Sequence, residues 1–156
     1  MIINNIKIHP NVKFGKGVKI VEPVNLYGCS LGNYVFIGPF VEIQENTVID
    51  NHTRIQSHTF ICSKVKIGKK CFIGHGVHFI NDDFKIGKNT KGNKKLWKKT
   101  TIENNVYIGS NSTILPVKIC SNTVVGAGSV VTKDITEPGV YAGNPAKLLK
   151  KFREDV

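Results

Sequence analysis

The sequence predicts an all-β fold of short strands that stack in successive coils. The first observation is that large apolar residues recur every six residues. This period fits neither the 3.6-residue repeat of an α-helix nor the two-residue alternation of a flat strand. The second is an enrichment of small and β-branched residues two positions before each apolar residue, which favours strands. The third is a frequent glycine just after it, where the backbone can change direction.

The six-residue period covers most of the chain. Its longest stretch consists of Leu31, Ile37, Ile43, Ile49, Ile55, Ile61, Ile67, Ile73 and Phe79. An earlier stretch in another phase comprises Ile8, Phe14, Ile20 and Leu26; a later one comprises Ile102, Ile108 and Ile114 and, after a slip of one residue, Ile119, Val125 and Val131. Each repeat sends one large side chain inward. Because a single coil cannot bury its own interior, the coils must stack and pair their strands.

This pattern resembles the left-handed parallel β-helix of the hexapeptide-repeat family. The resemblance covers nearly the whole chain. It implies that three hexads form one triangular coil, so that residues eighteen apart stack on one face. The predicted fold is therefore a left-handed parallel β-helix of hexapeptide repeats over residues 1–135.

Two segments depart from the repeat. Between Phe79 and Ile102 the register is lost, and residues 80–100, rich in Gly, Asn and Lys, are predicted to form one extruded loop. This loop contains the only tryptophan, Trp97, which we expect to pack against the body or a neighbouring subunit. Residues 136–156 are predicted to form a C-terminal turn, an extended piece and a short basic helix from Ala146 to Arg153, within the same single domain. Asn144 and Pro145 fit the N-cap and first position of such a helix.

The composition narrows the function. The chain has 22 Lys+Arg against 11 Asp+Glu, and such a positive field attracts phosphates. Aromatic residues do not interleave with the basic clusters, so no nucleic-acid partner is expected. No apolar run approaches the roughly 20 residues that span a bilayer, and no leader is evident, so we expect no membrane association and a cytoplasmic location. The four cysteines are scattered, and His52 and His58 should lie on different faces, so no metal is expected.

The C-terminal half carries a second resemblance. The segments 108–116, 124–135 and 141–147 look like the coenzyme A half of hexapeptide acyltransferases. The resemblance implies acetyl-CoA as co-substrate and a homotrimer with active sites between subunits. The matching cofactor-binding positions are Ser110 and Ala127 for pantetheine, Thr132 and Lys133 near adenosine, and Lys147 and Lys150 near the nucleotide phosphates. Small side chains allow close approach to the backbone, and lysines offset phosphate charge.

The acceptor side rests on residues 74–83. The stretch Phe79-Ile80-Asn81-Asp82 resembles the F-x-N-D stretch of acetyltransferases that modify the amine of nucleotide-linked 3-amino sugars. This implies a dTDP- or UDP-linked 3-amino deoxysugar acceptor, used in the biosynthesis of cell-surface polysaccharide such as lipopolysaccharide. We assign Phe79 and Asp82 to substrate binding and Asn81 to orienting the amine. His75 is the candidate to accept a proton, directly or through water.

Other readings remain open. Related galactoside and xenobiotic acetyltransferases use a histidine in the corresponding loop as a base, and no histidine follows Phe79 here. A neutral amine needs less help than a hydroxyl, so N-acetylation is favoured and O-acetylation of a sugar hydroxyl is the alternative. A non-catalytic β-helix scaffold is a third possibility. Where the family pattern has a proline and an arginine, this chain has Asp83-Phe84-Lys85-Ile86, which leaves the identity of the sugar open.

Overall fold

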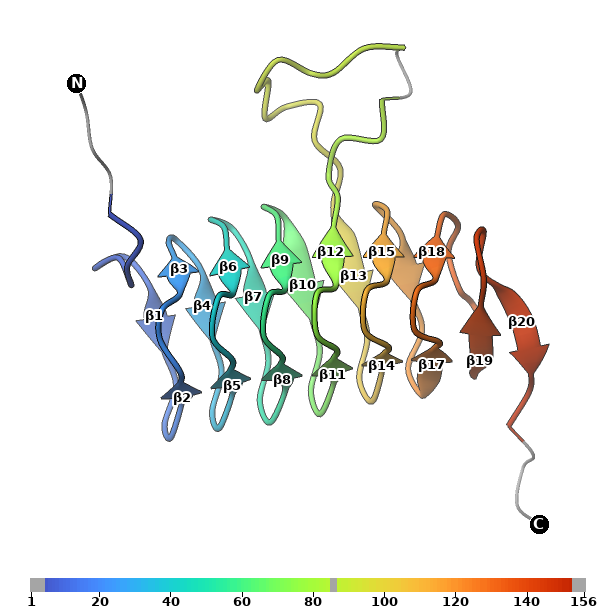
Figure 1. Ribbon diagram of the computed structural model, residues 1–156, viewed down its shortest axis with the longest axis horizontal. Coiled ribbons are helices and arrows are strands. Elements are labelled where there is room, and N and C mark those ends of the chain that lie inside the picture. The colour runs from blue at the N-terminus through green and yellow to red at the C-terminus, as the bar shows by residue number, and fades with distance from the viewer. Residues whose placement is uncertain (1–4, 85–86, 153–156) are drawn as a thin grey trace.

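The computed structural model describes residues 5–84 and 87–152, and within them the chain is built of strands and turns without a helix. The strands form the three faces of a left-handed β-helix, with β1 and β20 at opposite ends (Figure 1). The predicted fold class is thereby confirmed. None of the described residues forms a helix with the length and hydrophobicity that a bilayer crossing requires.

We call the three faces sheets I, II and III. Sheet I contains β1 (Lys13–Phe14), β4 (Ser30–Leu31), β7 (Val48–Ile49), β10 (Val65–Ile67), β13 (Thr100–Ile102) and β16 (Lys118–Ile119). Sheet II contains β2 (Lys19–Ile20), β5 (Phe36–Ile37), β8 (Arg54–Ile55), β11 (Phe72–Ile73), β14 (Tyr107–Ile108), β17 (Thr123–Val125), β19 (Gly139–Ala142) and β20 (Lys147–Lys150). Sheet III contains β3 (Asn25–Leu26), β6 (Glu42–Ile43), β9 (Phe60–Ile61), β12 (His78–Phe79), β15 (Thr113–Ile114) and β18 (Val130–Val131).

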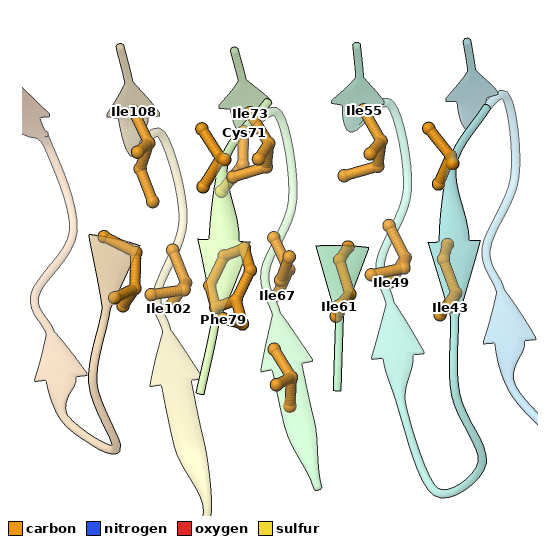
Figure 2. Close-up of a cluster of buried hydrophobic side chains, with 14 of the residues drawn as sticks. Ile43, Ile49, Ile55, Ile61, Ile67, Cys71, Ile73, Phe79, Ile102 and Ile108 are labelled. Carbon is orange, nitrogen blue, oxygen red and sulfur yellow. The ribbon is translucent and has the colours of Figure 1, made fainter. Parts of the chain in front are cut away.

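The hydrophobic period fills the interior of the helix. Ile37 pairs with Ile55, and Ile55 with Ile73, so residues eighteen apart stack as expected. The period isoleucines from Ile37 to Ile73 have no exposed surface, and Figure 2 shows those from Ile43 to Ile73 lining one continuous core. Phe14 differs, because it lies in the first coil near the open end and is 49% exposed.

Buried threonines join neighbouring coils beside this core. The hydroxyl of Thr53 donates to the backbone oxygen of Gly68 at 2.7 Å, and that of Thr59 donates to Gly74 at 2.9 Å. Both side chains are buried, so these bonds satisfy a polar group that would otherwise be costly inside the protein. The small β-branched position of the repeat therefore supplies a hydrogen bond as well as strand propensity.

The loop leaves the helix between β12 and β13 without interrupting the stack (Figure 1). Val65 of β10 pairs with Thr100 of β13, and the Thr100 amide donates to the oxygen of Lys64 at 3.1 Å. The strands on either side of the insertion thus keep the spatial order of an uninterrupted coil. The predicted loop is confirmed for its described residues, while Lys85 and Ile86 lie outside them.

The predicted C-terminal helix is wrong. Residues 147–150 form β20, which pairs antiparallel with β19. β19 adds to sheet II beside β17, and its other edge would expose unpaired backbone groups without β20. Pairing satisfies those groups, whereas a helix of one or two turns is marginal on its own. Arg153, the expected end of the helix, lies outside the described residues.

Cysteine reactivity offers a test of the packing. Burial raises the pKa of Cys62 to about 12 and that of Cys29 to about 11, and Cys71 is buried with its pKa also raised by burial. Because the thiolate is the reactive form, we expect these three thiols to react with a chromogenic aryl disulfide only after unfolding in guanidinium. Half-buried Cys120 serves as the internal comparison. Mass spectrometry of the labelled native protein checks this, and rapid labelling of Cys62 would contradict it.

Candidate active site

The turns between sheets II and III form one edge of the prism, which we call edge II/III. Its stacked turns place these residues in one column: Pro39, Ser57, His75, Ser110 and Ala127. Backbone hydrogen bonds join each turn to the next. The amide of Gly76 donates to Ser57 at 3.0 Å, that of Asn111 to His75 at 2.8 Å, and that of Gly128 to Ser110 at 2.8 Å. His75 therefore lies in the same column as both predicted pantetheine contacts.

His75 is exposed on this edge and contacts Ser57 in the preceding coil. Its Nδ1 lies 2.8 Å from the Ser57 hydroxyl oxygen. If Nδ1 carries the ring proton and donates to Ser57, then Nε2 of the neutral imidazole keeps a lone pair. In that tautomer the imidazole can accept a proton from a substrate. Sequence reasoning missed Ser57, although its eighteen-residue spacing from His75 is the repeat's own signal.

Small residues bring the turns of edge II/III close together. A Cβ on Gly74 would lie 2.6 Å from the backbone nitrogen of Ser110, and one on Gly109 would lie 2.4 Å from that of Ala127. Both contacts are with backbone, so neither glycine can be replaced without moving a turn. The edge is consequently lined by small residues from His75 towards the C-terminal coil. On the N-terminal side of His75 the same edge carries aromatic rings: Phe40 and His58 stack with ring centroids 4.9 Å apart.

Basic residues follow at the C-terminal end of this edge. Ala142 packs on Gly126, where an added Cβ would lie 2.9 Å from the Cβ of Ala142. Lys147 pairs with Ala142 in the β19–β20 ladder, and Lys150 pairs with Val140, two residues back along β19. Both lysines are exposed. The order along edge II/III is therefore imidazole, small side chains and then positive charge.

The remaining predicted residues lie on edge III/I, formed by the turns between sheets III and I. Asn81 follows β12, at the base of the loop. Its side-chain amide donates to the oxygen of Ser63 at 3.3 Å, and its backbone oxygen accepts from the amide of Lys98 at 3.0 Å. Thr132 and Lys133 follow β18 on the way to Ile135, which bridges to Ile119 in sheet I. Both are exposed.

Asp82 uses its carboxylate within the loop. One oxygen accepts from the amide of Thr90 at 2.8 Å, and the other accepts from the amide of Phe84 at 3.2 Å. These hydrogen bonds hold the pKa of Asp82 below its usual value, and the bond from the Thr90 amide contributes most. The carboxylate is thus kept ionised and tied to the backbone of the loop.

A hollow of about 590 Å³ lies over sheet III beside the loop. Its lining includes Asn81 and Asp82 together with Phe60, His78 and Trp97. Phe60, His78 and Trp97 were not predicted from the sequence to contact a ligand. His78 could have been found, because it precedes a buried strand residue and must point outward. Trp97 could not, because the position of a loop side chain is not encoded by the repeat.

The assignment of Phe79 requires a correction. Phe79 borders the hollow, but its side chain has no exposed surface. Figure 2 shows its ring inside the core, near Ile67 and Ile102. The ring therefore has a packing role, and the structure does not support a direct contact between this side chain and an acceptor. The inward position in the repeat explains why, because each such position carries a core residue.

The predicted site residues thus fall into two groups within one chain. His75, Ser110, Ala127 and Lys147 belong to edge II/III, whereas Asn81, Asp82, Thr132 and Lys133 belong to edge III/I. At about 3.3 Å per residue, the strand segment from His75 to Asn81 can span up to about 20 Å. His75 and Asn81 therefore lie before and after β12, on different edges of the prism. Within the described residues, no group of His, Cys, Asp or Glu side chains is arranged to hold a metal ion.

Comparison with known proteins agrees with this architecture. Residues 28–63 match the family model described as bacterial transferase hexapeptide (six repeats), and residues 99–133 match the one described as hexapeptide repeat of succinyl-transferase. By this comparison both stretches consist of hexapeptide repeats, and both lie within the β-helix described above.

Two curated relatives illustrate the range. The bifunctional protein GlmU of Clostridium botulinum is 39% identical over 122 residues, which cover 78% of this chain and 24% of the relative. A putative acetyltransferase of Saccharomyces cerevisiae, YJL218W, is 33% identical over 138 residues, covering 86% of this chain and 64% of the relative. The chain therefore spans about a quarter of the length of the first of these relatives.

Solved structures share the fold at low identity. PerB of Caulobacter crescentus, in complex with CoA and GDP-perosamine, has a TM-score of 0.63 at 21% identity, covering 90% of this chain and 55% of PerB. The N-acyltransferase AntD of Bacillus cereus, in complex with dTDP and coenzyme A, has a TM-score of 0.70 at 21% identity, covering 92% and 84%.

Proposed function

We propose that this protein is an acetyl-CoA-dependent N-acetyltransferase acting on the amine of a nucleotide-linked amino sugar. The observation that carries the proposal is the division of the site residues between edges II/III and III/I. In a ring of three copies the contact is heterologous, so one edge of each subunit faces a different edge of the next. A homotrimer built in this way brings His75 of one subunit to Asn81 of its neighbour. Each groove between subunits then holds one complete site.

The donor lies along edge II/III in this proposal. The pantetheine arm follows Ser110 and Ala127, where small side chains expose the backbone. The thioester is placed beside His75, and Lys147 and Lys150 offset the charge of the nucleotide phosphates. Thr132 and Lys133 of the neighbouring subunit complete the adenosine end from edge III/I.

The acceptor occupies the hollow beside the loop. Because the side-chain nitrogen of Asn81 is held by Ser63, its side-chain oxygen can accept an N–H of the acceptor amine and orient the nitrogen lone pair. The amine nitrogen bonds to the thioester carbonyl carbon, and the tetrahedral intermediate then loses coenzyme A as the C–S bond breaks. His75 takes the proton that the nitrogen gives up and returns it to the departing sulfur.

The finer assignment follows the family resemblance. We propose a dTDP- or UDP-linked 3-amino deoxysugar as the acceptor, in the biosynthesis of cell-surface polysaccharide, with the enzyme in the cytoplasm. The structural relatives support the broader class, because AntD was also solved with dTDP-4-amino-4,6-dideoxyglucose and coenzyme A. O-acetylation is the second candidate, favoured by the exposed imidazole of His75, which could deprotonate a hydroxyl.

The experiment is a thiol-release assay with acetyl-CoA. The acceptor panel contains dTDP- and UDP-linked 3-amino and 4-amino deoxysugars, GDP-perosamine and the matching hydroxy sugars. We expect release only with an amino sugar, and a fall of at least about tenfold in kcat/KM for Asn81→Ala, which removes a positioning hydrogen bond of about 1.5 kcal/mol or more. Asn46→Ala, in the same edge two coils away, is the matched control. Release with hydroxy sugars alone would establish the O-acetylation alternative instead.

A further inference from the structure

We propose that Asp82 is a positioning residue that holds Trp97, through Thr90, as the loop-side wall of the acceptor hollow. This inference deepens the proposed function, because it assigns the loop a part in acceptor recognition. It also revises the expectation that Asp82 binds the sugar directly. The three residues come from a segment that the repeat does not organise, so their placement depends on contacts made within the loop.

Both oxygens of the Asp82 carboxylate are already engaged by the loop. They accept the backbone amides of Phe84 at 3.2 Å and Thr90 at 2.8 Å. A carboxylate that accepts two backbone N–H groups fixes the path of the chain between them. One acceptor position on each oxygen is thereby committed to the loop backbone, and the two bonds fix the orientation of the carboxylate. The geometry therefore favours loop organisation over a direct ligand contact.

Thr90 connects Asp82 to Trp97 by hydrogen bonds to both. Its hydroxyl oxygen accepts the indole N–H of Trp97 at 2.9 Å, and the backbone oxygen of Trp97 accepts from the Lys64 ammonium at 2.9 Å. Across residues 87–99, Thr90 and Trp97 are half-buried and the other residues are exposed. Trp97 is thus held both at the nitrogen of its indole ring and at its backbone oxygen.

Trp97 faces a ligand-sized space rather than the core. It lines the hollow together with Phe60 and His78, which lie on the outward side of neighbouring strands in sheet III. A flat aromatic surface packs well against the apolar face of a deoxysugar or against a pyrimidine ring. Its orientation therefore decides how well the nucleotide sugar is held, while the acetyl donor lies on the other edge.

Trp97 is the only tryptophan of the chain, so its fluorescence reports the loop without any assay of activity. In the ligand-free protein we expect Asp82→Asn to shift the emission to longer wavelength and to increase quenching by acrylamide, because the freed indole becomes hydrated. Thr90→Val should act in the same direction. Asp50→Asn is the matched control, since Asp50 also accepts a backbone amide, that of Asn51 at 2.7 Å, on a distant face.

Kinetics supply the second readout. We expect Asp82→Asn to raise KM for the amino sugar by about tenfold, with kcat and KM for acetyl-CoA changed much less. Trp97→Ala should raise the same KM at least as much, and adding Asp82→Asn to it should have little further effect, because the two residues act as one unit.

Three results would overturn the inference. Unchanged fluorescence in Asp82→Asn would show that Asp82 does not hold Trp97. A raised KM with unchanged fluorescence would instead indicate direct binding of the sugar by Asp82. Independent effects of Asp82→Asn and Trp97→Ala on KM would exclude a shared route. If no amino sugar is acetylated at all, the proposed function fails, and the fluorescence comparison still decides whether Asp82 positions Trp97.

Discussion

Replacing His75 with alanine is expected to lower kcat for acetyl transfer by about 10²–10⁴-fold, the usual contribution of a positioned general base. KM for either substrate should change much less, because the imidazole acts on the proton that moves during the reaction. Ser57→Ala should cost only up to about tenfold, since it removes one neutral hydrogen bond of about 1 kcal/mol that orients the ring.

The control for this experiment is another histidine of the helix. His52 stacks on Tyr34, with ring centroids 5.1 Å apart, at the edge between sheets I and II. His52→Ala should leave kcat within about twofold of wild type, a free-energy change of less than about 0.5 kcal/mol. An equal loss of activity in His52→Ala and His75→Ala would point to a general structural effect instead of a proton acceptor.

Mixed trimers test whether the site is shared between subunits. The His75→Ala and Asn81→Ala chains, carrying different tags, are co-expressed and the trimers containing both are isolated. In the proposed arrangement a groove is intact when its His75 comes from one variant and its Asn81 from the other. In any ring that contains both variants exactly one of the three grooves has this pairing, so about a third of wild-type activity should return. Mixed trimers without recovery would contradict a shared site.

Replacing Phe79 with alanine is expected to lower the free energy of unfolding by about 3–5 kcal/mol. The side chain has no exposed surface. It fills the layer of the core that one coil contributes, between Ile61 and Ile114, the inward residues of the adjacent strands in sheet III. Its removal leaves a cavity that stacked coils cannot readily close, because their spacing is fixed by the strand ladder. Guanidinium unfolding followed by far-ultraviolet circular dichroism measures the effect.

Phe72 provides the matched comparison for Phe79. It lies in the preceding strand, β11, but points outward and is 37% exposed. Phe72→Ala should cost less, about 1–2 kcal/mol, because more than a third of the side chain is already exposed and its removal leaves no enclosed cavity. A Phe79→Ala protein of wild-type stability but raised KM for the acceptor would restore the predicted substrate contact.

The arrangement of the coils could be predicted from the sequence because a period of six residues encodes both the strand and the turn. Each residue of the six-residue period from Leu31 to Phe79 is buried, and the slip before Ile119 leaves that residue and Val125 buried as well. Ser110 and Ala127, which were assigned from the family resemblance, lie in turns stacked with that of His75. What the period specifies is the direction of each side chain and the coil to which it belongs.

Other features depend on interactions that the period does not contain. Residues 147–150 have a capping signal for a helix in front of them, yet the open edge of β19 favours a strand. Trp97 is positioned by hydrogen bonds across the loop, from residues whose partners cannot be inferred from spacing. The Phe79 error has a different origin, because a motif resemblance was preferred to the inward position that the repeat itself assigned.

The closure of the coil behind the loop has a consequence for how proteins with this fold diversify. Because β10 and β13 pair directly, the loop that joins β12 to β13 leaves and re-enters the helix at one edge, and its described residues contribute no strand to the scaffold. Its length and composition can drift, or a whole segment can be exchanged, while the stacked coils and the donor edge keep their geometry. Under the proposed function, selection for a new sugar can therefore change this loop without altering the β-helix. Related proteins that use the same acetyl donor should differ most between residues 81 and 99.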